Sequence, residues 1–268
     1  MQFYLENRSL FYEIYGEGHP IIILHAMGTD HQSMKAWMEP IFDTFEGFQR
    51  IYIDIPAHGK SMIDEKIKST QDMLEFILKF IDQTLPQKEF SLIGHSFGGY
   101  IAQGIMHSRI SNVKGLCLLA SALHQKNRTV PERVVVKRDE HELTQMDSDI
   151  QLAFDTLMVY QTKDNLEKFL NEVQPGRLLA NKEFLSSNWR ENGYYLKEEP
   201  LLNQSEVSQP ALFLLGKHDS ICGYKDHLEY LNKFKNGTVS ILDTGHLMAI
   251  EKRSVVQMLV KDWVMNLY

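Results

Sequence analysis

Cysteine is scarce in this chain, and so is any excess of positive charge. The two cysteines among its 268 residues, Cys117 and Cys222, are too few for a disulfide scaffold, and their spacing is not that of a metal site. Lysine and arginine number 28 against 35 aspartates and glutamates, which gives a formal net charge of −7. Because nucleic acids and anionic membranes are bound by concentrated positive charge, we expect no nucleic-acid partner and no membrane partner.

Long apolar runs and internal repeats are also missing. No segment approaches the length needed to span a bilayer, and the N-terminus lacks the basic and apolar pattern of a cleavable signal. We therefore expect a cytoplasmic protein with reduced thiols. The length suits one large α/β domain or two small domains, and the sequence leaves open whether the protein is a monomer or a homodimer.

Apolar segments typical of strands alternate with amphipathic segments typical of helices. An antiparallel hairpin is expected first, at residues 3–6 and 9–15. The strands expected after it lie at residues 20–25, 49–55, 90–94, 113–120, 210–216 and 238–242. The helices expected among them lie at residues 32–45, 70–85, 99–107, 224–235 and 250–267. This alternation predicts an α/β fold whose central sheet is mostly parallel and has helices on both faces.

The alternation is interrupted between residues 122 and 208, where the sequence is charged and rich in helix-like segments. Only residues 134–136 suggest a strand within this stretch. We expect residues 1–121 and 209–268 to form one core domain, and residues 122–208 to form a helical cap inserted before the last strands. Because α/β sheets bind ligands at the carboxyl ends of their strands, the cap should lie over the binding site.

One serine lies between glycines, directly after an expected strand. Ser96 is the central residue of the Gly-His-Ser-Phe-Gly motif at residues 94–98, and a helix-like segment follows it. A sharp turn from strand to helix requires small flanking residues and lifts the serine hydroxyl clear of the sheet. A serine that merely caps the helix is the competing interpretation. The strand and helix on either side favour Ser96 as a nucleophile.

A serine hydroxyl is a weak nucleophile at neutral pH, so it needs a base, and the base needs an acid that orients it. His246 is favoured among the eleven histidines because it follows the last expected strand. Asp219 follows the strand at residues 210–216 and is the favoured acid, whereas the segment after residue 120 offers no carboxylate. Asp243, three residues before His246, is better explained as a turn residue.

The order Ser96, Asp219, His246, each after a strand, resembles the α/β-hydrolase family. Three further segments agree with this resemblance. His-Ala-Met-Gly at residues 25–28 resembles the family's His-Gly loop. Residues 54–61 resemble its Asp-x-Pro-Gly-x-Gly-x-Ser turn, and Gly245-His246 with Glu251 resembles its closing Gly-His-x-x-x-x-Glu. The matching segments span residues 21–251, nearly the whole core.

The resemblance implies an oxyanion hole made by the backbone N–H groups of Phe97 and Met27. Ala26 and Ala57 stand where the family has glycine. Alanine restricts positive φ values, so these two turns depart from the family pattern.

Four aromatic side chains are candidate substrate contacts, and each has a structural role as its alternative. His25 and His95 flank the motifs just described, and Trp189 and Tyr194 belong to the expected cap. Apolar cap residues line a pocket in some proteins and pack a helical core in others. No histidine spacing indicates a metal site.

The resemblance implies a serine hydrolase that needs no cofactor. We expect a carboxylesterase that cleaves a small or medium ester through an acyl-enzyme intermediate. Related chemistry on lactones, thioesters, N-terminal peptides or carbon–carbon bonds is the first alternative, because a fold does not fix the substrate. The second is a ligand receptor or signalling protein that hydrolyses its ligand slowly.

Overall fold

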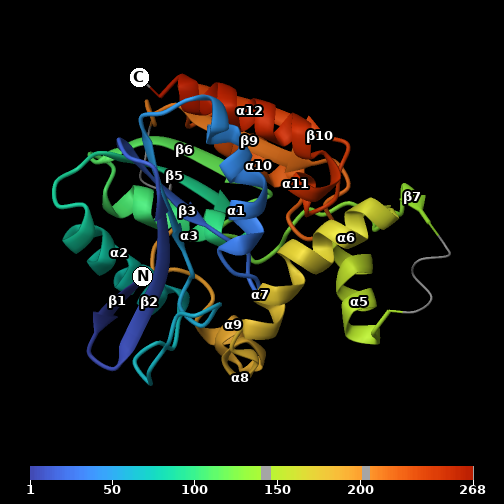
Figure 1. The fold of residues 1–268 in the computed structure, drawn as a ribbon, viewed down its shortest axis with the longest axis horizontal. Coiled ribbons are helices and arrows are strands. Elements are labelled where there is room, and N and C mark those ends of the chain that lie inside the picture. The colour runs from blue at the N-terminus through green and yellow to red at the C-terminus, as the bar shows by residue number, and fades with distance from the viewer. Residues whose placement is uncertain (140–145, 201–205, 268) are drawn as a thin grey trace.

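A computed structural model describes residues 1–139, 146–200 and 206–267 of the chain (Figure 1). Among these residues, eight strands form one sheet in the order β1-β2-β4-β3-β5-β6-β9-β10. The antiparallel hairpin at its edge comprises β1 (Gln2–Leu5) and β2 (Arg8–Tyr15), and β2 pairs antiparallel with β4. The parallel strands are β3 (His19–Leu24), β4 (Phe48–Ile53), β5 (Phe90–His95), β6 (Val113–Leu119), β9 (Ala211–Gly216) and β10 (Gly237–Leu242). The α/β fold expected from the sequence is confirmed.

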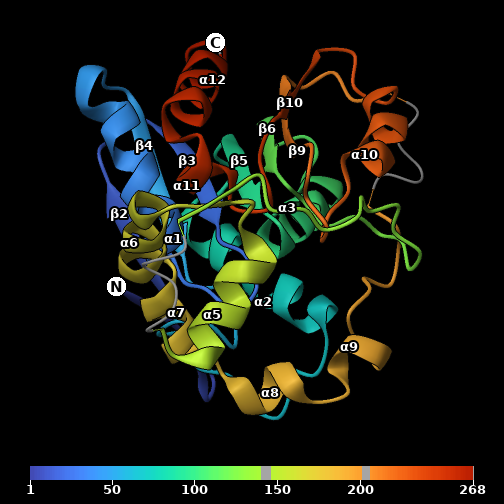
Figure 2. The ribbon, with the colours of Figure 1, turned by 90° about the vertical axis from the view of Figure 1, so that its right-hand side faces the viewer.

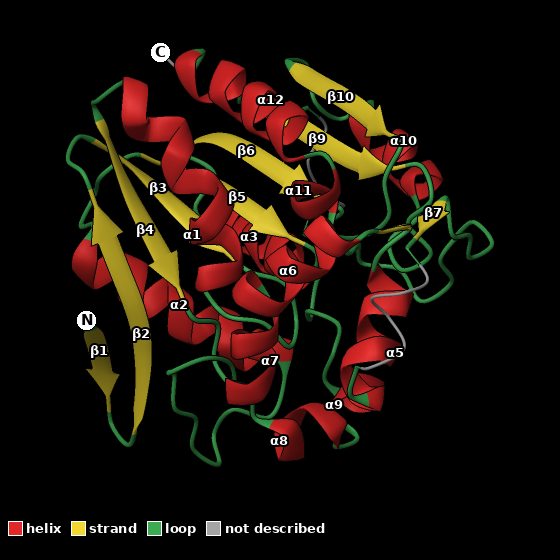
Figure 3. Cartoon of the chain, turned by 45° about the vertical axis from the view of Figure 1, so that its right-hand side comes forward, coloured by secondary structure: helices red, strands yellow, loops and turns green. Residues whose placement is uncertain are grey.

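Helices cover both faces of the sheet because successive strand residues point to opposite sides. Ile22 and Leu24 of β3 pack with α2 (Thr70–Thr84) and α3 (Phe97–Ser108). Ile21 and Ile23 pack on the other side, with α1 (Gln32–Met38) and α12 (Arg253–Met265). Figure 3 shows α1 and α12 in front of the sheet, with α2 and α3 behind it. The sheet is therefore buried on both faces, as its continuous apolar runs require.

The segment between β6 and β9 holds a group of short helices. They are α5 (Ser148–Leu157), α6 (Lys163–Glu172), α7 (Gln174–Leu179), α8 (Lys182–Ser186) and α9 (Trp189–Asn192). A short parallel pair, β7 (Lys137–Arg138) and β8 (Tyr160–Gln161), precedes and interrupts them. Figures 1 and 2 show these helices gathered on one side of the sheet. The division of the chain into a core domain and a cap at residues 122–208 stays a prediction.

The helical segment packs directly onto the chain near His246. Phe154 of α5 and Phe169 of α6 are fully buried and form an apolar cluster with Leu247 and Ile250. Within the described residues, no helix is long and apolar enough to cross a membrane.

Three elements differ from the expected ones. Val134 to Val136 are exposed, and the short strand comprises Lys137 and Arg138 instead, which pair with Tyr160 and Gln161. The helix expected at residues 32–45 ends at Met38 and continues as a 3-10 helix, η1 (Glu39–Thr44), where Pro40 removes a backbone donor. The helix expected at residues 250–267 is divided at Lys252 into α11 (Met248–Glu251) and α12.

We expect Leu92→Ala to lower the free energy of unfolding by about 2–5 kcal/mol, because it leaves a cavity in the strand that carries Ser96. Leu92 is fully buried, whereas Leu152 in α5 is 65% exposed. The matched variant Leu152→Ala should change the free energy by less than about 0.5 kcal/mol. Urea unfolding measures both, and equal effects of the two variants would contradict the assignment of β5 to the core.

Candidate active site

Ser96 lies at a strained turn between β5 and α3. Its backbone has φ 52° and ψ −115°, a conformation that side-chain-bearing residues rarely adopt. The turn is closed by backbone contacts that leave no room for side chains. A Cβ on Gly98 would lie 2.4 Å from the carbonyl oxygen of His25, and a Cβ on Gly94 would lie 2.5 Å from Cα of Gly99. The spacing of small residues read from the sequence is thus a steric requirement.

Three predicted residues form one hydrogen-bonded chain. The Oγ atom of Ser96 lies 2.9 Å from Nε2 of His246, and Nδ1 of His246 lies 2.8 Å from Oδ2 of Asp219. Asp219 is fully buried, while His246 and Ser96 are 4% and 8% exposed. They come from the ends of β5, β9 and β10, which meet at one edge of the sheet. The structure therefore brings together side chains that lie up to 150 residues apart in the sequence.

Asp219 is held as a charged group by its surroundings. Its second oxygen, Oδ1, accepts hydrogen bonds from the backbone N–H groups of Ile221 at 2.8 Å and Cys222 at 3.0 Å. Burial would raise the pKa of this carboxyl, but the charge and hydrogen bond of His246, with the two N–H groups, lower it below its ordinary value. The carboxylate is thus fitted to orient the imidazole and to stabilise its protonated form.

Asp243 has other partners. Its carboxylate contacts Nε2 of His218 at 2.8 Å and the hydroxyl of Tyr160, and it is exposed. This agrees with the interpretation of Asp243 as a turn residue.

Glu251 fixes the loop that carries His246. Its carboxylate accepts N–H bonds from Gly245 at 2.6 Å, Val159 at 2.6 Å and Tyr160 at 2.9 Å. The N–H group of His246 donates to the carbonyl of Leu157 at 3.1 Å. The His246 loop is therefore tied to the α5–β8 connection of the helical segment.

A cavity of about 440 Å³ opens beside Ser96 and His246. Met27 lines it from the loop after β3, and Leu157 and Tyr194 line it from the helical segment. Its volume suits a small molecule, and Ser96 and His246 both line it.

Comparison with known proteins identifies the architecture. The sequence model of the alpha/beta hydrolase fold matches residues 19–253. The chain belongs to the α/β hydrolase family. A hydrolase from Acinetobacter baylyi, "(E)-2-((N-methylformamido)methylene)succinate hydrolase", is 23% identical over 96% of this chain and 95% of its own length.

Solved structures agree with this assignment. An α/β superfamily hydrolase from Oenococcus oeni superposes with a TM-score of 0.88 and 25% identity, covering 100% of this chain and 99% of that one. An enol-lactonase from Burkholderia xenovorans shares the fold, with a TM-score of 0.75 and 20% identity over 99% of this chain and 100% of that one.

The two residues expected to form the oxyanion hole line the same cavity as Ser96 in this hydrolase. Within the described residues, the backbone N–H groups of Phe97 and Met27 donate to no protein oxygen. Gly28 takes a positive φ of 73°, whereas Ala26 does not, so the first loop needs no glycine at position 26. Ala57 does adopt φ 69°, a strain of about 1–2 kcal/mol that the second turn tolerates. The roles of Phe97 and Met27 stay predictions.

Of the four predicted substrate contacts, only Tyr194 lines the cavity. His25 is placed elsewhere: its ring is fully buried and bonded on both sides, to the N–H of Ile55 at 2.9 Å and the carbonyl of Ala26 at 2.8 Å. Trp189 is buried against Phe97 with its N–H directed to the carbonyl of Leu185, so packing accounts for it.

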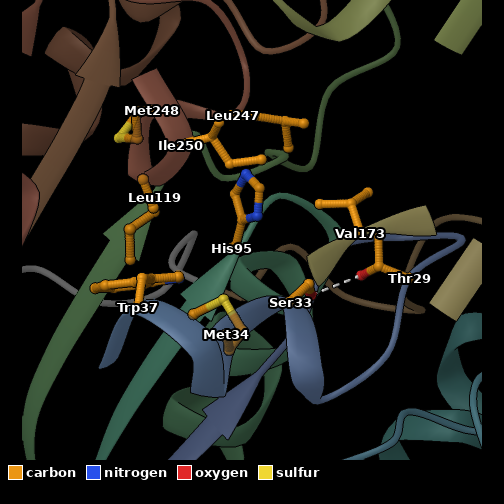
Figure 4. A pocket seen from close by; sticks show the side chains of 11 residues that line it. Thr29, Ser33, Met34, Trp37, His95, Leu119, Val173, Leu247, Met248 and Ile250 are labelled. Atoms are coloured by element: carbon orange, nitrogen blue, oxygen red, sulfur yellow. Dashed lines mark hydrogen bonds between the residues drawn. The ribbon is translucent and has the colours of Figure 1, made fainter. Parts of the chain in front are cut away.

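His95 faces a different space. Figure 4 shows its ring among Leu247, Ile250 and Val173, in a cavity of about 20 Å³ that is too small for a substrate. Its Nε2 lies 3.1 Å from the carbonyl oxygen of His246, and burial, aided by the charge of His246, lowers the pKa of His95 to about 3. His95 therefore supports the His246 loop as a neutral ring and is not in the larger cavity.

Two cavity residues, Arg128 and Arg190, were not found from the sequence. Each is a single arginine in a long charged segment, and no spacing distinguishes it from a solvated residue. The sequence predicts no metal site. The described residues contain no group of three or more His, Cys, Asp or Glu side chains that could hold a metal ion.

We expect Glu251→Ala to lower the free energy of unfolding by at least about 2 kcal/mol, because three N–H groups lose their acceptor. Glu229→Ala is the matched control, since Glu229 is exposed on α10 (Tyr224–Leu231). Urea unfolding measures both. If Glu251→Ala were as stable as Glu229→Ala, Glu251 would not be the residue that holds the His246 loop.

Proposed function

We propose that this protein is a serine hydrolase that cleaves a carboxylic ester through an acyl-enzyme intermediate. The observation that carries the proposal is the unbroken chain from Ser96 Oγ through His246 to Asp219, with distances of 2.9 and 2.8 Å. A serine, a histidine and an aspartate that are hydrogen-bonded in this order beside a cavity can transfer an acyl group to the serine.

In the proposed reaction, Ser96 Oγ attacks the ester carbonyl carbon while Nε2 of His246 takes the hydroxyl proton. The carbonyl oxygen becomes an oxyanion, and the N–H groups of Phe97 and Met27 stabilise it. Collapse of this intermediate breaks the bond to the alcohol, which receives the proton from His246. Water then attacks the acyl-serine in the same way and releases the acid.

Two findings bear on the substrate. Solved structures that share the fold include esterases, such as one from Exiguobacterium antarcticum at a TM-score of 0.75, and the cavity volume suits a small or medium ester. The curated relative is named for a substrate with an N-methylformamido group, which makes an amide-type bond the second candidate. A receptor that hydrolyses its ligand slowly would use the same side chains and differ in rate.

We expect Ser96→Ala to reduce kcat for p-nitrophenyl butyrate by at least about three orders of magnitude, because the nucleophile is lost. Ser254→Ala, at an exposed position of α12, is its matched control. Labelling with a fluorophosphonate should be lost in the first variant and kept in the second. Full activity of Ser96→Ala would refute the proposal, and slow turnover by the unaltered protein would favour the receptor.

A second pair of variants distinguishes Asp219 from Asp243 as the partner of His246. Asp219→Asn should lower kcat about 10³- to 10⁴-fold, because an amide cannot hold the imidazole in the required form. Asp243→Asn should leave kcat within about twofold, because Asp243 contacts His218 and Tyr160 instead. The reverse pattern would make Asp243 the partner of His246.

A further inference from the structure

The cavity beside Ser96 carries positive charge in a protein whose net charge is −7. Arg128 and Arg190 both line it, and none of its described lining residues is an aspartate or glutamate. The other lining residues are apolar or neutral, apart from His246. Charge of one sign in a cavity with apolar walls attracts ligands of the opposite sign.

These two arginines differ from the others in the described part of the chain. Six arginines pair with a carboxylate within 4 Å, namely Arg8, Arg50, Arg109, Arg138, Arg177 and Arg253. Arg128, Arg190 and the exposed Arg133 have no such ion pair among the described residues. Two of these three arginines thus line the cavity beside Ser96.

Arg128 is held in place from two sides. It is half-buried, Nη1 donates to the carbonyl of Ile221 at 3.2 Å, and Nη2 donates to the hydroxyl of Tyr194 at 3.3 Å. Its guanidinium carbon also lies 6.0 Å from the centre of the Tyr194 ring. All of these partners are uncharged, so its charge stays available to a ligand. A guanidinium has five N–H donors, and its planar fork matches a carboxylate.

Arg190 approaches from α9, on the side of the cavity formed by Met27. Its Nη2 donates to the sulfur of Met27 at 2.8 Å. A thioether is a weak acceptor, so a carboxylate oxygen would replace it with a gain in hydrogen-bond strength. The cavity therefore presents guanidinium groups next to Ile221 and next to Met27, and Ser96 belongs to the same lining.

We propose that the substrate of this hydrolase carries a carboxylate group, in addition to the bond that is cleaved, and that Arg128 and Arg190 bind it. This inference rests on the proposed function, because it assigns the substrate class of the same site. The arginines would hold the acid group while Ser96 attacks the carbonyl, so they determine specificity and take no part in bond breaking.

The test compares two acetate esters that differ in charge, 4-acetoxybenzoate and 4-acetoxybenzamide. We expect kcat/KM of the wild-type protein to favour the carboxylate by at least about tenfold, as a charge-assisted hydrogen bond allows. Arg128→Gln and Arg190→Gln should each reduce this preference at least about fivefold, mainly through KM, and the double variant should abolish it. Raising the salt concentration should weaken the preference as well.

Arg133→Gln is the matched control, because Arg133 is exposed, lies in the same segment as Arg128 and does not line the cavity. It should keep the wild-type preference. Arg190 is exposed, so Arg190→Gln should remain folded and test the proposal even if Arg128→Gln unfolds. Thermal unfolding followed by circular dichroism identifies a variant that does not fold.

Failure of this inference is distinct from failure of the proposed function. If Ser96→Ala still hydrolysed the esters, the proposed nucleophile would be wrong. If both esters reacted equally, or the preference survived the double arginine variant, carboxylate recognition would be overturned and the hydrolase proposal would stand. If the wild-type protein hydrolysed neither ester, calorimetry would decide: 4-acetoxybenzoate should bind Ser96→Ala, and absence of binding, or binding kept after both arginine substitutions, would overturn the inference.

Discussion

The left-handed backbone at Ser96 is the constraint on which the rest of the site depends. It exists because β5 turns into α3 without a connecting loop, and because Gly98 lets the turn approach the carbonyl of His25. This conformation is unfavourable for serine on its own, so packing on both sides must maintain it. The hydroxyl is thereby placed at the edge of the sheet, where the imidazole of His246 lies 2.9 Å away.

Much of this arrangement was predictable from the sequence, since its determinants are local. Strand, tight turn and helix leave a pattern of apolar and small residues around Ser96, and the same reasoning located Asp219 and His246 at the ends of other strands. The carboxyl ends of β5, β9 and β10 lie on the same side of the sheet because these strands run parallel. Knowing the fold class is therefore enough to predict that Ser96, Asp219 and His246 lie close together.

What the sequence did not reveal depends on contacts with distant residues. His25 and His95 look equally available in the sequence, yet packing buries one completely and turns the other toward a small apolar space. Arg128 and Arg190 have no recognisable sequence pattern. What distinguishes them is that they line the cavity and form no ion pair with a carboxylate of the described residues, and this depends on the folded structure. The break of the last helix at Lys252 follows a residue, Glu251, whose carboxylate is engaged with the His246 loop and β8.

The hydrogen bonds of Glu251, together with the bond from His246 to the carbonyl of Leu157, make the helical insertion part of the frame that holds the imidazole. Exchanging the whole segment for that of a related protein would therefore also replace the partners of the His246 loop. Residues Leu157 to Tyr160 should be kept in such an exchange, because they hydrogen-bond to His246 and Glu251. The hydrogen bonds described for α8 and α9 go to other residues, so these two helices can be exchanged without removing the partners of the His246 loop.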